Sequence, residues 1–128
     1  LDPDVGLALD VTPCSDTPKL ENDKYEGKLV EGPNIELVQG WGRGMIATED
    51  IKEWLIETAE DQEINYEKRL GGGNDARSIE MNKGGVPTGS IGIPTRHIHS
   101  PVEVAKVSDL KQTLNLLTES FKSLEEYF

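Results

Sequence analysis

The chain opens on an alternating pattern of apolar and small residues. Val5, Leu7 and Leu9 stand between Gly6 and Ala8, and Asp10 ends the apolar run. Because almost every side chain before Asp10 is apolar or small, residues 5–11 predict a strand covered on both faces. Asp10 is then expected at the C-terminal end of that strand.

Three further apolar segments are short and bounded by turn-forming residues, as strands are. They lie at residues 34–40, 64–70 and 86–94, and the middle one alternates in the way expected of an exposed or edge strand. Residues 12–33 contain three prolines and two glycines, which predicts an irregular surface segment. A short strand is expected within it, near residues 28–31.

Three segments have helical patterns. Thr48 is a suitable N-cap for a helix over residues 49–62, and Asn74 for a short helix over residues 74–85. A C-terminal helix is expected to begin after Ser108 and to lie on the sheet by an apolar stripe with alternating spacings of four and three. The stripe consists of Leu110, Leu114, Leu117, Phe121 and Leu124.

Helices and strands therefore alternate along most of the chain, with mostly short connections. This order predicts an α/β fold, with a mostly parallel sheet and helices on both faces. A length of 128 residues suits one domain or part of one. Functional sites of such sheets collect beyond the C-terminal ends of the strands, where Asp10 and the histidine segment at residues 97–99 are expected.

The composition excludes several classes of partner. Thirteen Lys and Arg residues against 24 Asp and Glu give a net charge of -11, so neither nucleic acid nor an anionic membrane surface is an expected partner. No apolar run approaches the roughly 18 residues of a membrane span. The single cysteine, Cys14, allows no internal disulfide, which favours a reducing, cytoplasmic setting.

The two histidines of the chain, His97 and His99, are the first candidates for chemistry. In extended backbone they point to the same face, where imidazole can bind zinc, cobalt or manganese. The alternative is two ordinary histidines at a strand end. Asp10 needs a partner near an apolar core, which is either a metal ion or the turn that follows it.

The glycine-rich stretch before the second predicted helix is another candidate. The sequence "GGGNDA" at residues 71–76 permits a close backbone approach and is compatible with an anion cradle. Asp75 would repel an anion there, so a tight turn between strand and helix is favoured.

Three motifs in order resemble the glutamyl aminopeptidase-like metallopeptidases, the family of tetrahedral, dodecameric aminopeptidases, some labelled deblocking aminopeptidase or endoglucanase. They are "GLALDVTPCSDTP", "GGGNDA" and "GVPTGSIGIPTRHIHSPVEV". The resemblance implies a zinc-peptidase type of αβα sandwich and a cytoplasmic enzyme that removes N-terminal residues from peptides. It also implies two divalent metal ions, zinc or cobalt, with manganese also compatible, and homo-oligomers up to a dodecamer.

The resemblance assigns roles to individual residues. It implies that Asp10 and His99 are metal ligands, each serving a different ion. It places Asp75, Asn74 and His97 in the vicinity of the substrate pocket, and it gives no ligand role to His97, where relatives often have Tyr. Asn74 stands where many relatives have Thr, and Arg77 where small residues are common, so both alter the vicinity of the substrate pocket.

The resemblance also implies what the chain lacks. The remaining ligands, the general-base Glu and the inserted oligomerisation domain are expected upstream, so residues 1–128 would form the C-terminal part of a catalytic domain and be inert alone. Two alternatives stay open. One is a hydrolase of the same fold with another substrate, such as a glycosidase, and the other is a non-catalytic interaction domain.

Overall fold

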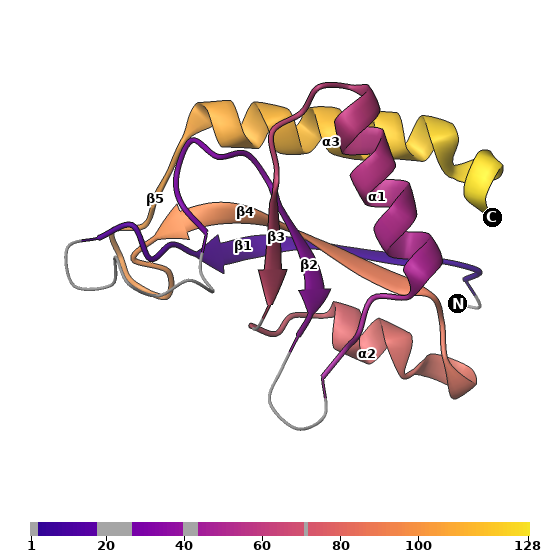
Figure 1. Cartoon of the computed structure of the whole chain (residues 1–128). Helices are drawn as coiled ribbons and strands as arrows, with labels where there is room; N and C mark the ends of the chain where they lie inside the picture. Colours follow the sequence, from indigo (N-terminus) through magenta and orange to yellow (C-terminus); the bar gives the residue numbers. More distant parts are fainter. Residues whose placement is uncertain (1–2, 18–26, 40–43, 71) are drawn as a thin grey trace.

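The computed structural model describes residues 3–17, 27–39, 44–70 and 72–128 (Figure 1). Within these ranges the strands form one sheet in the order β1, β4, β2, β3, with β5 paired to β4. The strands are β1 (Gly6–Pro13), β2 (Asn34–Val38), β3 (Glu67–Leu70), β4 (Thr88–Arg96) and β5 (Val104–Ala105). β1 and β3 lie at the two ends of this order, so the predicted edge position of the 64–70 segment is confirmed.

The sheet is mixed. β1 runs parallel to β4 over eight residue pairs, from Gly6 opposite Thr88 to Pro13 opposite Thr95. β2 and β3 are also parallel, whereas β2 is antiparallel to β4, as is β5. The predicted α/β class is confirmed, and the two antiparallel pairings are an addition that apolar patterns alone do not reveal, because such patterns read the same in both strand directions.

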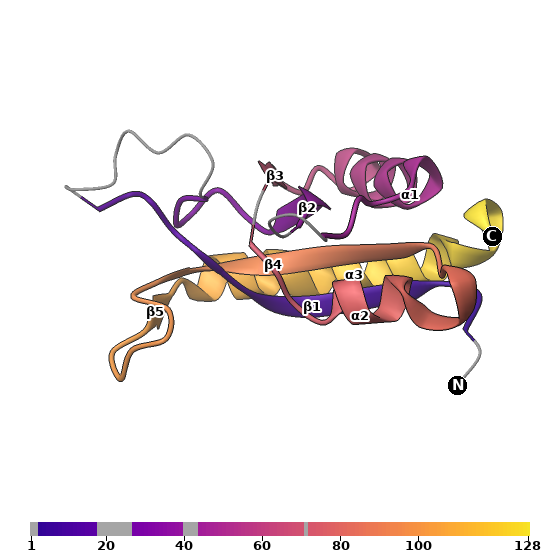
Figure 2. The same ribbon diagram turned by 90° about the horizontal axis from the view of Figure 1, so that it is seen from below.

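Helices cover both faces of the sheet, as expected. The helices are α1 (Glu49–Asp61), α2 (Ala76–Glu80) and α3 (Val107–Tyr127), with a 3-10 turn at Asn82–Gly84. Leu7 of β1 points to the core shared with α1 and α3, whereas the next residue, Ala8, packs with Ala76 and Ile79 of α2. Figures 1 and 2 show α2 beside β1, separate from the pair formed by α1 and α3. None of the described helices is long and apolar enough to span a membrane.

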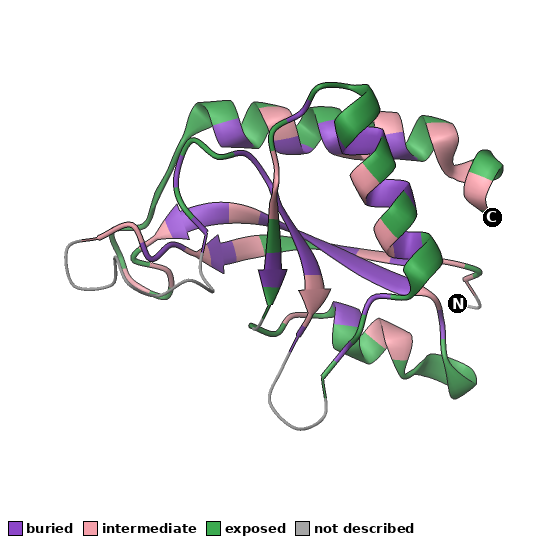
Figure 3. Cartoon of the chain, viewed as in Figure 1, coloured by how far each residue is buried: buried purple, intermediate pink, exposed green. Residues whose placement is uncertain are grey.

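The main core lies between the sheet and helices α1 and α3 (Figure 3). Ile35 and Ile91 supply it from the sheet, and Trp54 from α1. The Trp54 indole N–H donates to the carbonyl oxygen of Ser120 at 3.0 Å, which joins α1 to α3. A buried Trp whose N–H has a partner contributes apolar area without leaving an unpaired polar group.

Three local predictions are wrong. Instead of a strand near residues 28–31, Gly27 makes one bridge with Cys14, and Val30 lies in a turn with a φ of 75°. The predicted 74–85 helix is divided into α2 and the 3-10 turn, with Lys83 at a φ of 47°. α3 begins at Val107 with Lys106 as its N-cap, so Ser108 does not cap it.

Only part of the apolar stripe of α3 faces the core, to which Leu117 and Leu124 contribute. Leu110, Leu114 and Phe121 are exposed, and the buried positions are Asp109, Thr113, Leu116 and Ser120. The buried polar groups Asp109 and Thr113 have partners inside the protein, which removes most of the cost of burying them. The Thr113 hydroxyl donates to the Asp109 carbonyl at 2.7 Å, and the Val30 backbone N–H donates to the Asp109 carboxylate at 2.9 Å.

Part of the stripe borders a hollow between α3 and the sheet. Leu110, Leu114 and Leu117 line an apolar hollow of about 350 Å³ together with Leu9 and Ile93. Leu9 is 51% exposed, so the predicted cover on both faces of the first strand is incomplete at this residue.

A pair of leucines on α3 tests this orientation. Leu116 is 0% and Leu114 is 65% exposed. Leu116→Ala is expected to lower the free energy of unfolding by about 3 kcal/mol, because it leaves a cavity in the core. Leu114→Ala should cost less than about 1 kcal/mol, since an exposed substitution removes few contacts. Urea denaturation of both variants measures the difference, and a larger loss for Leu114→Ala would show that the helix is rotated.

Candidate metal centre

Asp10 lies on the α2 side of β1. The strand continues to Pro13, two residues beyond its predicted end at residue 11, so Asp10 is inside the strand rather than at its terminus. Its side chain is exposed, and its Oδ1 accepts a hydrogen bond from the Val11 backbone N–H at 2.7 Å. The opposite residue on β4 is Gly92, which has no side chain that would cover the carboxylate.

The two histidines lie in the turn that follows β4. The prediction of extended backbone is wrong here, because β4 ends at Arg96 and both His97 and His99 have left-handed φ values of 58° and 64°. Both are exposed, and the His99 backbone N–H donates to Glu103 Oε1 at 2.7 Å. Left-handed backbone at a non-glycine residue is strained and is common near functional sites.

A hollow of about 190 Å³ brings the predicted site residues together. Asp10, Asn74 and His99 line it with the Gly72–Gly73 backbone. Asp10 and Asn74 also border a second hollow of about 360 Å³, where Asp75 takes part. His97 is not among the lining residues of either hollow.

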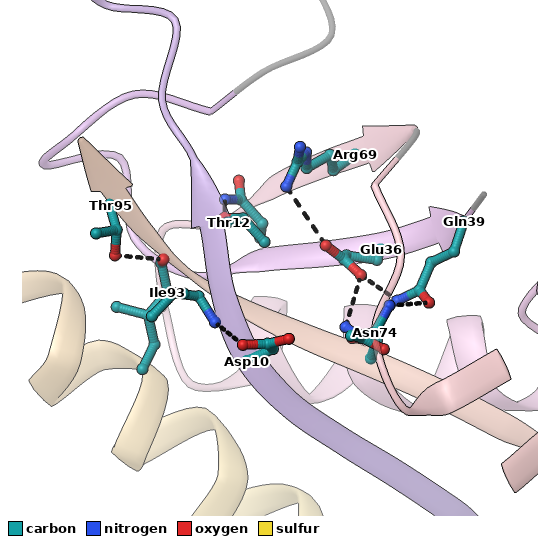
Figure 4. Close-up of polar contacts among 11 residues, drawn as sticks. Asp10, Thr12, Glu36, Gln39, Arg69, Asn74, Ile93 and Thr95 are labelled. Atoms are coloured by element: carbon teal, nitrogen blue, oxygen red, sulfur yellow. Dashed lines mark hydrogen bonds and ion pairs between the residues drawn. The ribbon is translucent and has the colours of Figure 1, made fainter. Parts of the chain in front are cut away.

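A buried polar network beside the first hollow was not predicted from the sequence. It joins Glu36 of β2, Gln39 just after β2, Arg69 of β3 and Asn74 (Figure 4). Asn74 links this network to Ser90 of β4. Glu36 and Arg69 are only 2% and 5% exposed. The sequence gives only a partial signal for it, a charged residue within each of two predicted strands, Glu36 in "NIELVQG" and Arg69 in "INYEKRL".

The electrostatics of this network centre on Glu36. Burial raises the pKa of the Glu36 carboxyl, the positive charge of Arg69 opposes this shift, and the negative charge of Asp10 reinforces it. The Arg69 Nη1 lies 3.5 Å from Glu36 Oε1. Figure 4 shows Asp10 beside the cluster of Glu36, Gln39 and Asn74.

The turn that carries Asp75 is stabilised by the side chain of Asn74. The Asn74 Oδ1 accepts a hydrogen bond from the Ala76 backbone N–H at 3.0 Å, which closes a turn immediately before α2. Asp75 is the N-cap residue of α2, is exposed, and makes no side-chain capping bond. α2 has only five residues, which is too short for an anion site at its N-terminus. The tight turn before α2 is therefore the better explanation of the glycine-rich sequence.

The donor atoms at the first hollow fit divalent metal ions in type. A carboxylate oxygen from Asp10 and an imidazole nitrogen from His99 suit zinc, cobalt or manganese. Among the residues that the structure describes, no group of three or more such side chains is close enough to hold one ion. Since metal sites in proteins normally use three or four donors, an ion bound at Asp10 or His99 would need further ligands beside them.

The α/β fold of the chain is that of a class of solved aminopeptidase structures. It superposes on the solved structure of an aminopeptidase from the archaeon Desulfurococcus kamchatkensis with a TM-score of 0.85 and 43% identity, over 93% of this chain and 34% of that one. The chain also superposes on a TET1 peptidase structure from Pyrococcus horikoshii with a TM-score of 0.66 and 25% identity, over 91% of this chain and 32% of that one. That peptidase is described as assembling into a tetrahedron or a large octahedral shell.

Sequence comparison identifies the family. Residues 1–116 match the M42 glutamyl aminopeptidase family, so the chain belongs to it. A putative aminopeptidase of Acetivibrio thermocellus is 38% identical over 120 residues, which are 92% of this chain and 35% of that protein. The chain therefore spans about a third of the length of these relatives.

Proposed function

We propose that this chain is part of a two-metal aminopeptidase that hydrolyses N-terminal residues from peptides. The observation that carries the proposal is the meeting of Asp10, from strand β1, and His99, from the turn after β4, at one hollow of an M42 family fold. The donor types fit divalent cations, and the family assignment gives the reaction class.

In this proposal Asp10 and His99 each bind a different metal ion, zinc or cobalt in the first instance, with manganese also compatible. When bound, such a pair of ions activates water and polarises the scissile carbonyl. The Asp10 carboxylate is oriented by the hydrogen bond that it accepts from the Val11 backbone N–H. The backbone of His99 is fixed by the hydrogen bond that its N–H donates to Glu103. Further ligands and the general base come from outside residues 1–128, which correspond to the C-terminal part of the catalytic domain and are inactive alone.

The substrate is a peptide, and its N-terminal residue lies against the turn at residues 72–76. Asn74 and Asp75 support this placement because both border the hollows that contain Asp10. His97 stays in the vicinity of the pocket, in the turn next to His99, and receives no ligand role.

The setting of the enzyme is proposed to be the cytoplasm, where a lone thiol such as Cys14 stays reduced. The complete protein is proposed to be a homo-oligomer, up to a dodecamer. The support for this is the shell assembly named for the related Pyrococcus horikoshii TET1 peptidase.

The test of the function begins with the intact mass of the protein purified from its source, compared with 14.1 kDa. A mass well over twice that value is expected, since the matched relatives are about three times longer. That complete protein is then assayed with leucine and glutamate p-nitroanilides and with a cellulose-derived substrate.

Removal of metal by a chelator is expected to reduce p-nitroanilide hydrolysis by about 100-fold or more, and zinc or cobalt should restore it, because the ions activate the attacking water. The cellulose-derived substrate serves as the control and should not be cleaved. Cleavage of that substrate alone would support the glycosidase alternative. Hydrolysis that the chelator leaves unchanged would contradict the metal mechanism.

A further inference from the structure

Both side chains of the ion pair between Glu36 and Arg69 are buried, and neither residue is a proposed metal ligand. Glu36 is on β2 and Arg69 on β3, and both line the hollow that contains Asp10 and His99. The Arg69 Nε is buried without a hydrogen-bond partner among the described residues. Replacing a buried ion pair by apolar residues often leaves stability unchanged, so stability alone does not explain this pair.

We infer that Glu36 and Arg69 are positioning residues, which fix the turn at residues 72–76 as a wall of the hollow and thereby orient the N-terminal residue of the peptide. This inference rests on the proposed aminopeptidase function. The two residues act through Asn74 and are not among the proposed metal ligands.

The contacts of Glu36 show how the turn is held. Its Oε2 accepts a hydrogen bond from Asn74 Nδ2 at 3.2 Å and another from Gln39 Nε2. Its Oε1 faces Arg69 Nη1. Arg69 thus fixes one carboxylate oxygen of Glu36 and leaves the other for the turn.

The contacts of Asn74 complete the argument. Its Nδ2 donates to both Glu36 and Ser90, the latter at 2.6 Å, and its Oδ1 accepts from the Ala76 N–H. Its backbone N–H donates to Gln39 Oε1 at 3.3 Å. With its amide groups committed to the protein, Asn74 acts as a clamp on the turn rather than as a ligand for substrate.

The turn needs such a clamp because its sequence gives it little rigidity. Gly72 has a φ of 84°, and a Cβ placed on it would lie 3.7 Å from Arg69 Nη2. Glycine backbone loses more freedom on ordering than any other residue, so an external anchor decides how well the wall is defined. The Arg69 guanidinium lies close to the turn at Gly72, and Glu36 holds the turn through Asn74.

The experiment compares two double variants of the complete protein. The apolar double variant, Glu36→Leu with Arg69→Met, removes the anchor and leaves no unpaired buried charge. The amide double variant, Glu36→Gln with Arg69→Met, also removes both charges but keeps an oxygen that can accept from Asn74. Lys68→Met is the matched control, because Lys68 is the exposed neighbour of Arg69 on β3.

The apolar double variant is expected to lose at least about tenfold in kcat/KM, mostly through a higher KM, since small misplacements of a bound substrate are costly. Its zinc affinity, measured by calorimetry, should stay within about threefold because both proposed ligands are untouched. The amide double variant keeps an acceptor for Asn74 but lacks Arg69, so it should lose clearly less kcat/KM than the apolar double variant. The Lys68→Met control should keep kcat/KM within about threefold of the unmodified protein.

Hydrogen exchange at the amides of Asn74 and Ala76 gives a readout that does not depend on activity. Exchange should be at least about tenfold faster in the apolar double variant only. Unchanged exchange and an unchanged KM would overturn the inference, and so would equal losses in the amide double variant.

If the apolar double variant does not fold, Gln39→Leu replaces it, with the same expected rise in KM and faster amide exchange. An unmodified protein without aminopeptidase activity would refute the proposed function, while the exchange result would still decide the positioning role.

Discussion

Replacing His99 with Ala, or Asp10 with Ala, is expected to abolish metal-dependent turnover in the complete protein, with a loss of kcat/KM of about 1,000-fold or more for each. Each substitution removes one donor from a different proposed ion. A site reduced to two protein ligands binds zinc or cobalt weakly, so the metal is lost or misplaced.

The readouts are kcat/KM with leucine p-nitroanilide and the number of metal ions per chain. Asp10→Asn is a useful companion, because its amide oxygen can keep the bond to the Val11 N–H that Asp10 makes at 2.7 Å while binding metal less well. His97→Ala is the comparison for the turn, with an expected loss below about tenfold, since His97 does not line the hollow. Full activity and full metal content in His99→Ala would refute its role as a ligand.

Local patterns predicted the positions of several elements well. β1, β2, α1 and β4 lie close to their predicted ranges, because short apolar runs bounded by turn residues and helical spacing both report on burial. α3 shows the limit of this reasoning. Its leucine stripe satisfied the pattern, yet the buried face contains Asp109, Thr113 and Ser120. Some of their hydrogen bonds come from residues distant in sequence, such as Val30 and Trp54, which no local window includes.

Two residues of the candidate site, Asp10 and His99, were named from the sequence without any use of burial patterns. Asp10 and His99 were singled out by residue type and by resemblance, and the parallel pairing of β1 with β4 explains why they share a hollow. The Glu36 network escaped prediction because its members come from three strands and one turn, and a buried charge is recognisable only once its partner is known. Sequence spacing alone does not pair Glu36 with Arg69.

Gly32→Ala is expected to cost more than about 4 kcal/mol of unfolding free energy, because two steric penalties coincide at this position. Gly32 has a φ of 87°, which disfavours any residue with a side chain. A Cβ there would also lie 1.9 Å from the backbone oxygen of Asn65 and 2.7 Å from Gln112 Oε1. The Gln112 side chain can move, but the Asn65 carbonyl precedes β3 and cannot shift without displacing the strand.

Gly84→Ala separates these two penalties. Gly84 has a similar φ of 96°, but nothing lies within 4 Å of the position of its Cβ. It should therefore cost only about 1–2 kcal/mol, the penalty for left-handed backbone. Urea denaturation of both variants measures the difference, and equal losses would show that the segment before β2 can move away from Asn65. β2 and β3, the pair of strands that this close approach joins near their start, also carry Glu36 and Arg69, which line the hollow with Asp10 and His99.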